Sequence, residues 1–260
     1  MDLGLKDKVA IVAAASKGLG KAVAQVLASE GCRVAICSRD SASLQKAAES
    51  IGADTFAMPV NVTDEEQVKG FVEKVQEKFG RVDICIANAG GPPSKPFAET
   101  SMTDWENAIR TNLMSTLYFA HAVLPGMRER KWGRFITITS ASVKQPLDGL
   151  ILSNSVRSAV ANLVKSLSNE CGPDNVLVHN VCPGFTATDR LLDLAAALAK
   201  KENTTPDAIV QRWSTQTALK RVGTPDEFAN VVAFLASESS SYMTGASIAV
   251  DGGLIKGIFS

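Results

Sequence analysis

Short apolar runs separated by longer amphipathic stretches constrain the fold of this chain more than any other feature of the sequence. Runs such as VAIVAAA at 9–15 and VDICIANAG at 82–90 carry little charge, and the others lie at 33–38, 54–62, 133–140, 176–184 and 247–253. Nearly charge-free strands that alternate with helices predict a parallel sheet covered on both faces. We therefore expect a single doubly wound α/β domain over residues 1–260, with three layers.

The amphipathic stretches contain signals for where helices begin and for one irregular segment. Thr63 and Glu66, in TDEEQVKGFVEKVQEKFG, have the spacing of a capping box. Residues 185–219 have a helical pattern but follow a strand end, where segments of such sheets cover binding sites. A polar KKENTT tract interrupts this pattern, so we expect the segment to be a substrate lid, of which residues 190–215 are the most mobile part of the chain and become ordered when ligand binds.

Charge balance and cysteine content narrow the class of partner. The 27 Lys and Arg residues equal the 27 Asp and Glu residues, so no net field attracts nucleic acid or a membrane, and a small molecule is the expected partner. The five cysteines lack metal-ligand spacing, which predicts reduced, buried thiols and no metal site. His121 and His179 are expected to be ordinary structural histidines. The first residues lack the pattern of a secretory signal, so we expect a cytoplasmic protein.

Small residues between the first strand and the first helix predict a phosphate-binding turn. Glycine permits positive φ there, and the backbone N–H groups at the helix start stabilise a pyrophosphate. Ala14 takes the place of the first glycine of such a turn, and because alanine requires ordinary φ/ψ we expect a slightly remodelled turn. The expected cofactor contacts here are Ala14, Ser16, Lys17, Gly18, Leu19 and Gly20.

The end of the second strand predicts which dinucleotide binds. Ser38 and Arg39 lie where the adenosine ribose would sit. An acid at this point would bind both ribose hydroxyls and favour NAD, whereas an arginine can clamp a 2′-phosphate. Lys17 could supply a second cation. We therefore expect NADP (NADPH) as the cofactor, with NAD less favoured.

Motifs in the same order along nearly the whole chain resemble the short-chain dehydrogenase/reductase family, in particular members that reduce 3-oxoacyl thioesters. They are the KGLG loop, Asn88 to Gly90, Asn112 in RTNLMST, Ser140 in ITITSAS, Pro183 with Gly184 and Thr188, and the closing TGASIAVDGG. The resemblance implies a Rossmann fold and a homotetramer, formed partly through the helices that carry Asn112 and Ser153. It also implies cofactor contacts at Asn61, Val62, Asn88, Ala89, Gly90, Arg157, Pro183, Gly184, Thr186 and Thr188.

The chain departs from this family at its catalytic residues. The family's serine, tyrosine and lysine fall on Ser140, Ser153 and Arg157, with Asn112 shaping the proton relay. The family's tyrosine is the general acid, and its lysine lowers the pKa of that phenol. A serine hydroxyl is a far weaker acid, and arginine has no accessible neutral form. Neither Tyr118 nor Tyr242 has a lysine four residues later, so no change of register restores the pair.

Two functions remain open at this stage. The first is an NADP(H)-dependent oxidoreductase of a carbonyl or secondary alcohol, with Ser140, Ser153, Arg157 and Asn112 as its catalytic set. Its proton would come from water or from Lys144 or Asp148, in the segment SVKQPLDG. The second is an NADP(H)-binding protein with little or no turnover, acting as a sensor or partner subunit.

Overall fold

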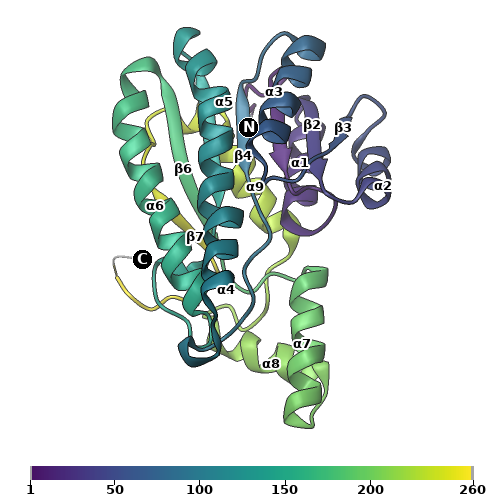
Figure 1. Cartoon of the computed structure of the whole chain (residues 1–260), viewed down its shortest axis with the longest axis vertical. Helices are drawn as coiled ribbons and strands as arrows, with labels where there is room; N and C mark the ends of the chain where they lie inside the picture. Colours follow the sequence, from purple (N-terminus) through teal and green to yellow (C-terminus); the bar gives the residue numbers. More distant parts are fainter. Residues whose placement is uncertain (1, 259–260) are drawn as a thin grey trace.

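A computed structural model describes residues 2–258 of the chain, and its strands form one parallel sheet (Figure 1). The strand order is β3-β2-β1-β4-β5-β6-β7. The strands are β1 (Val9–Ala13), β2 (Arg33–Ser38), β3 (Phe56–Pro59), β4 (Ile84–Ala87), β5 (Gly133–Ile138), β6 (Val176–Pro183) and β7 (Ser247–Val250). The predicted strands are confirmed, each with the same or narrower bounds.

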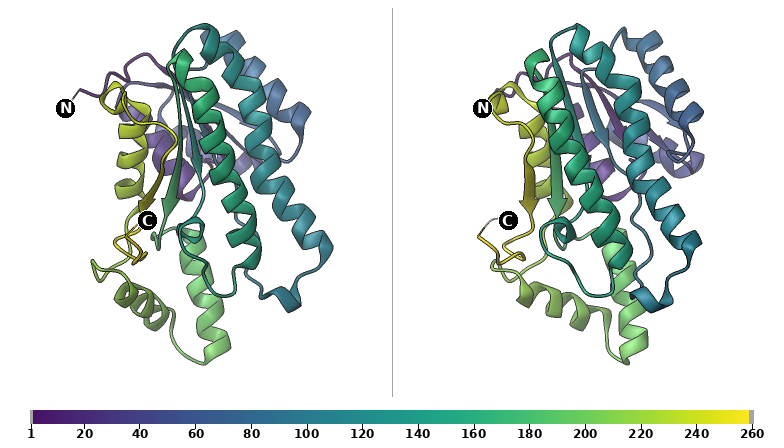
Figure 2. Two further views of the ribbon diagram at one scale, coloured as in Figure 1. Left: turned by 90° about the vertical axis from the view of Figure 1, so that its left-hand side faces the viewer. Right: turned by 60° about the vertical axis from the view of Figure 1, so that its left-hand side comes forward.

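Helices cover both faces of the sheet (Figure 2). One face carries α1 (Gly18–Ser29), α2 (Ser41–Ile51) and α9 (Pro225–Ala236), and the other carries α3 (Glu65–Phe79), α5 (Ser115–Glu129) and α6 (Ile151–Cys171). The strand order reverses between β1 and β4. This is the predicted three-layer, doubly wound α/β fold.

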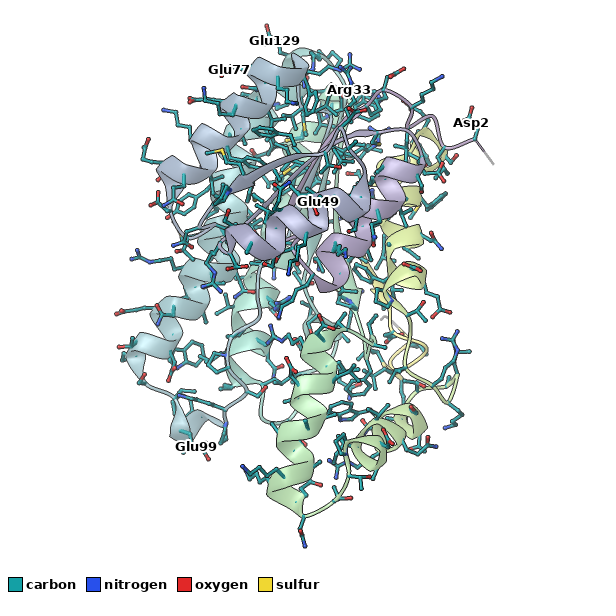
Figure 3. All side chains as sticks on the ribbon, turned by 90° about the vertical axis from the view of Figure 1, so that its right-hand side faces the viewer. Asp2, Arg33, Glu49, Glu77, Glu99 and Glu129 are labelled. Carbon is teal, nitrogen blue, oxygen red and sulfur yellow. The ribbon has the colours of Figure 1, made fainter. Side chains whose placement is uncertain are left out.

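The two hydrophobic cores follow from the alternation of side chains along each strand. Every residue of β1 is buried, with Ala10 and Val12 facing one core and Val9 and Ile11 facing the other. A strand with an apolar residue at every position therefore binds helices on both sides. The side chains of Glu77 in α3 and Glu129 in α5, labelled in Figure 3, point outward from the helical layer.

The chain after β6 forms two helices that extend beyond the sheet. They are α7 (Asp189–Glu202) and α8 (Pro206–Gln216), at the lower end of Figure 1. They pack on each other through a small core that contains Ala195, Ala199, Ile209 and Trp213. Phe185 stacks on Trp213 with ring centroids 5.3 Å apart, which joins this pair to the end of β6. The remaining helix, α4 (Met102–Ala108), precedes α5.

The predicted capping box at Thr63 and Glu66 is wrong. The N-cap of α3 is Asp64, whose carboxylate accepts a hydrogen bond from the backbone N–H of Gln67 at 3.1 Å. The hydroxyl of Thr63 donates to Oδ1 of Asn61 at 3.0 Å. Because Asn61 engages the Thr63 side chain, the helix starts one residue later.

The cysteines agree with the prediction, whereas one histidine does not. All five cysteines are free and buried, and burial raises the pKa of the Cys37 thiol to about 12. His179, in β6, is completely buried, and neither ring nitrogen has a hydrogen-bond partner within residues 2–258. Burial lowers its pKa to about 4, so it is neutral at physiological pH. The backbone of Met243 lies close enough to oppose this shift, so the expected satisfied structural histidine has a neighbour there but no hydrogen bond of good geometry.

No helix within residues 2–258 is both long and apolar enough to span a membrane.

Candidate active site

The predicted cofactor residues other than Arg157 lie at the carboxyl ends of the strands, on the edge of the sheet that α7 faces (Figure 2), and Arg157 reaches this edge from α6. Residues 14–20 follow β1, Ser38 and Arg39 end β2, and residues 88–90 follow β4. Because the strand order reverses between β1 and β4, this edge contains the crevice where open α/β sheets bind their ligands.

The turn between β1 and α1 is tight enough to require glycine. Gly18 has a φ of +60°, in the left-handed region. A Cβ on Gly20 would lie 2.7 Å from the carbonyl oxygen of Ala14 and 2.9 Å from Nδ2 of Asn88. That amide donates to the carbonyl of Ala13 at 3.2 Å, which ties the end of β4 to the turn. The backbone is thus free of side chains where a pyrophosphate would approach the start of α1.

The expectation of ordinary φ/ψ at Ala14 is wrong. Its φ is +49°, the left-handed conformation that favours glycine. Its neighbour Ala15 donates its N–H to the carbonyl of Cys37 at 3.1 Å, and the Ala14 carbonyl lies against Gly20. Tertiary contacts therefore impose the glycine-like conformation on an alanine, and the turn keeps its shape without the first glycine.

The end of β2 presents a cation without a competing acid. Arg39 and Lys17 are both exposed. The neighbouring Asp40 caps α2 by accepting from the backbone N–H of Ser43 at 2.7 Å, and bonds from Ser43 lower the pKa of this carboxyl. The negative charge of Asp40 therefore faces the N-terminus of α2. This arrangement fits a 2′-phosphate better than a pair of ribose hydroxyls.

The predicted adenine contacts after β3 have different surroundings. Oδ1 of Asn61 accepts from both the backbone N–H and the hydroxyl of Thr63, at 3.2 and 3.0 Å. The acceptor that we expected to face the adenine is therefore engaged within its own turn. Val62 is buried in the core against α3, so its backbone is the part available to a ligand.

The segment after β6 brings the start of α7 to the glycine turn. A Cβ on Gly184 would lie 2.7 Å from Cα of Asp251, so Pro183 and Gly184 pack directly against the end of β7. Thr188 caps α7 through the backbone N–H of Leu191, and a Cβ on Gly18 would lie 3.6 Å from the Thr188 methyl group. Thr186 lies between them and is buried. The predicted residues of β1 and β6 thus meet across the crevice.

Three serine side chains form a cluster at the predicted catalytic position. Ser140 follows β5 and its hydroxyl accepts from the backbone N–H of Ser142 at 3.1 Å. The hydroxyls of Ser142 and Ser153 lie 3.3 Å apart, and both side chains are buried. The spacing of Ser140 and Ser153 was visible in the sequence. Ser142 was missed, because the 3-10 turn at Ala141–Val143 brings its hydroxyl to Ser153.

Arg157 lies one turn after Ser153 and is a buried cation without a carboxylate partner within residues 2–258. It is 7% exposed, and Nη1 donates to the carbonyls of Ile138 and Thr139 at the end of β5. The Nε of this side chain has no hydrogen-bond partner in the described part of the chain. Burial, and secondly the charge of Arg190, lower its pKa to about 10, so the side chain remains charged at neutral pH. Its position retains a fixed positive charge beside the serine cluster.

Asn112 lies in a π-helical turn, η2 (Ile109–Met114), between α4 and α5. The side-chain amide of Asn112 donates to the carbonyl of Ala108 at 3.1 Å, and the hydroxyl of Thr116 donates to the backbone carbonyl of Asn112 at 2.8 Å. With Arg157 and Thr139 it lines a cavity of about 10 Å³, which is room for about one water molecule. The π-turn, which often marks a functional site, thus directs Asn112 toward Arg157.

The tyrosines and the predicted proton donors lie apart from this cluster or at its edge. Tyr118 packs against the core beside α3, and Tyr242 is fully exposed. Asp148 is exposed, whereas Lys144 is half-buried. Lys144 and Arg157 both oppose the rise in the pKa of Cys182 that burial causes, so both cations act on the end of β6.

Arg190 is a second cation at the site that the sequence did not indicate. It lies in the first turn of α7 and donates from Nη2 to the carbonyl of Pro92 at 3.3 Å. A Cβ on Gly91 would lie 2.6 Å from the same nitrogen, so the guanidinium rests on the backbone after β4. Its position at the site depends on where α7 lies in the fold, which residue patterns do not reveal.

Comparison with known proteins gives consistent matches over the whole chain. A family described as enoyl-(acyl carrier protein) reductase matches residues 13–255. The 3-oxoacyl-(acyl-carrier-protein) reductase FabG of Aquifex aeolicus is 33% identical over 98% of this chain and 100% of its own length. Acetoacetyl-CoA reductase of Cupriavidus necator is 31% identical over 97% and 100%. The solved structure of L-sorbose reductase from Gluconobacter frateurii, complexed with NADPH and L-sorbose, is 31% identical with a TM-score of 0.95, covering 99% of this chain and 100% of that one.

Proposed function

The chain belongs to the short-chain dehydrogenase/reductase family, and on this premise we propose that it is an NADP(H)-dependent oxidoreductase that interconverts a carbonyl and a secondary alcohol. The relatives named as a 3-oxoacyl thioester reductase, an acetoacetyl-CoA reductase and a sorbose reductase support this reaction class. A ketone, either free or as a 3-oxoacyl thioester, is the proposed substrate. The observation that carries the proposal is the buried Arg157 beside Ser142 and Ser153 at the end of β5.

The residues of the crevice fit a dinucleotide. The cradle at Gly18 and Gly20 would hold the pyrophosphate at the start of α1, and Arg39 with Lys17 would hold the 2′-phosphate. Thr188 would contact the nicotinamide carboxamide, as the family resemblance implies. When bound, the cofactor supplies or accepts the hydride.

The protein's own residues supply orientation and charge. Arg157 would donate hydrogen bonds to the nicotinamide ribose and would keep a positive charge near a developing alkoxide. Ser153, held by Ser142, donates to the substrate oxygen, while Ser140 fixes the turn that positions Ser142. The proton reaches this oxygen from water or from Lys144. The small cavity between Arg157 and Asn112 is a suitable place for a relay water.

A binding protein with little or no turnover is the second candidate. The observation in its favour is that neither phenol of the chain lies near Ser153. General acid catalysis contributes about 10²–10⁴-fold to such reactions, and serine is a poor acid. Steady NADPH oxidation with a panel of ketones supports the enzyme, whereas tight NADPH binding without oxidation supports the binding protein.

The assembly, location and lid are proposed as follows. The surface between α5 and α6 has an apolar groove of about 430 Å³, lined partly by Leu117, Leu124 and Leu167, which suits the helix-to-helix contact of a homotetramer. The whole chain acts as one domain in the cytoplasm. Residues 185–219 form a lid that orders over the bound ligand. Hydrogen exchange with and without NADPH tests the lid, and equal protection in both states contradicts it.

A further inference from the structure

The chain from Ser142 to Ser153 forms a loop whose two ends meet at the serine cluster. It follows β5 and leads into α6, and the hydroxyls of its two end residues lie 3.3 Å apart. Compact loops with adjoining ends often carry function. This segment, residues 142–153, is called the rim loop below, because it stands at the edge of the crevice beside the serine hydroxyls. Its exposed residues are Gln145, Pro146, Asp148 and Gly149.

Asn154, the residue after Ser153, clamps the middle of the rim loop. Its Nδ2 donates to the carbonyl of Leu147 at 2.9 Å, and its Oδ1 accepts from the backbone N–H of the same residue at 3.3 Å. A side-chain amide can satisfy both backbone groups of one residue because it carries a donor and an acceptor. Within residues 2–258, these are the only side-chain hydrogen bonds to residues 145–149. The exposed part of the rim loop is thus held to α6 by one side chain.

A tight turn connects the clamped residue with the segment after β4. The backbone N–H of Leu150 donates to the carbonyl of Leu147 at 3.3 Å, and Gly149 between them has a φ of +71°. Glycine adopts this conformation without the clash of a Cβ. Leu150 also forms a parallel bridge with Lys95, whose ammonium pairs with Asp104 in α4 at 2.9 Å. The clamp therefore holds the chain after β5 and the chain after β4 together at the edge of the crevice.

We infer that Asn154 is a positioning residue for substrate binding: by holding Leu147, it keeps the rim loop in the arrangement in which a ketone reaches Ser153. This rests on the proposed function. Within the described part of the chain the side chain of Asn154 bonds to Leu147 alone, so it acts on the substrate through the loop and leaves NADPH binding and hydride transfer to other residues. Without the clamp, a smaller fraction of the protein has the competent rim, and the apparent substrate affinity falls in proportion to that fraction.

The test compares wild type with two variants of the clamp and one matched control. Asn154→Ala removes both bonds to Leu147, and Asn154→Asp keeps the size of the side chain but replaces the donor with an oxygen that faces the Leu147 carbonyl. Asn162→Ala is the control, because this exposed asparagine lies on the same helix and its amide donates to the helix's own carbonyl at Ser158.

Three measurements are made on each protein. The probes are cyclohexanone, ethyl 3-oxobutanoate and the N-acetylcysteamine thioester of 3-oxobutanoate, and NADPH oxidation gives KM and kcat. The same probes are titrated into the protein–NADPH complex by following the fluorescence of bound NADPH, which requires no turnover. Backbone hydrogen exchange of the rim loop is followed by mass spectrometry.

Both Asn154 variants should show faster hydrogen exchange in the rim loop. They should raise the KM and the dissociation constant of the probes by about 3- to 30-fold, which is the effect of losing one or two neutral hydrogen bonds. The kcat and the NADPH affinity of these variants should stay close to the wild-type values, and Asn162→Ala should match wild type in every measurement.

Faster exchange in the rim loop with unchanged probe affinity makes Asn154 a purely structural residue and overturns the inference, while the proposed function stands. Unchanged exchange in both variants overturns it as well, and so does a loss of NADPH affinity that matches the loss of probe affinity. Asn154-dependent binding of a probe without NADPH oxidation supports the positioning role and contradicts the proposed function. If no probe binds the wild-type complex, the inference falls together with the proposed function.

Discussion

Replacing Arg157 with methionine should stabilise the fold while it damages the site. Methionine keeps most of the length of the apolar stem and removes a charge that is 7% exposed and has no carboxylate partner within residues 2–258. It also removes an Nε that has no hydrogen-bond partner. Buried charges of this kind cost folding free energy, and apolar replacement is often neutral or stabilising.

The size of the effect follows from the pKa of Arg157. Its fall from 12.5 to about 10 corresponds to about 3 kcal/mol against the charged form in the folded state. Because the folded pKa lies below the unfolded one, this cost applies in full at every pH below about 10. The carbonyls of Ile138 and Thr139 lose a donor in the variant, which costs about 1–2 kcal/mol. The net gain is about 1–2 kcal/mol.

Urea unfolding at pH 7.5 without cofactor measures this gain directly. The urea concentration at the unfolding midpoint should be higher for the variant, while the slope of the free energy of unfolding against urea concentration stays the same. The melting temperature should rise by about 2–6 °C. With saturating NADPH wild type should become the more stable of the two proteins, because NADPH binding stabilises wild type more than it stabilises the variant. If Arg157→Met is less stable than wild type by about 2 kcal/mol or more without NADPH, then interactions in the fold offset the cost of burying the Arg157 charge. This result would refute the reasoning.

Four further predictions test other parts of the account. Arg39→Ala should weaken NADPH binding by about 10- to 100-fold in a fluorescence titration and spare NADH; equal affinity of wild type for both cofactors would contradict it. Gly20→Ala places a Cβ 2.7 Å from the Ala14 carbonyl and should lower the melting temperature and cofactor affinity, whereas Gly70→Ala, with no atom within 4 Å, should not. The pKa of His179 is near 4 in the folded state, so on acidification the unfolded state binds the proton at a higher pH than the folded state. The free energy of unfolding of wild type should therefore fall by about 3 kcal/mol between pH 6.5 and pH 4, and His179→Leu should remove most of this pH dependence in urea unfolding. Ser153→Ala should reduce kcat at most about tenfold; loss of all turnover in this variant, with NADPH still bound, would make Ser153 the acid. Combining Ser153→Tyr with Arg157→Lys should raise the turnover rate on a ketone by more than the two single changes together, because the lysine tunes the tyrosine.

The sequence was sufficient for the sheet because each strand is apolar at nearly every position. Parallel strands are buried on both faces, so their sequence pattern differs from that of any other element in this chain. Counting from Ser140 also located Ser153 and Arg157, because both lie on one helix with a fixed spacing.

Contacts between distant segments explain what the sequence could not predict. The positive φ of Ala14 depends on the hydrogen bond from Ala15 to β2, and the orphaned ring of His179 depends on the burial of β6. Ser142 reaches Ser153, and Arg190 reaches the loop after β4, only because the 3-10 turn and α7 bring them there. None of these contacts leaves a periodic signal in the chain.

Hydride transfer is the central claim, and isotope transfer measures it most directly. The protein is incubated with NADPH that carries deuterium at both positions of the reactive ring carbon, together with a panel of free ketones and 3-oxoacyl thioesters, and the alcohol product is analysed by mass spectrometry. The account predicts one deuterium at the new carbinol carbon for at least one substrate, with much less product from Arg157→Met. Tight NADPH binding with no labelled alcohol from any substrate would contradict the account and leave a cofactor-binding protein.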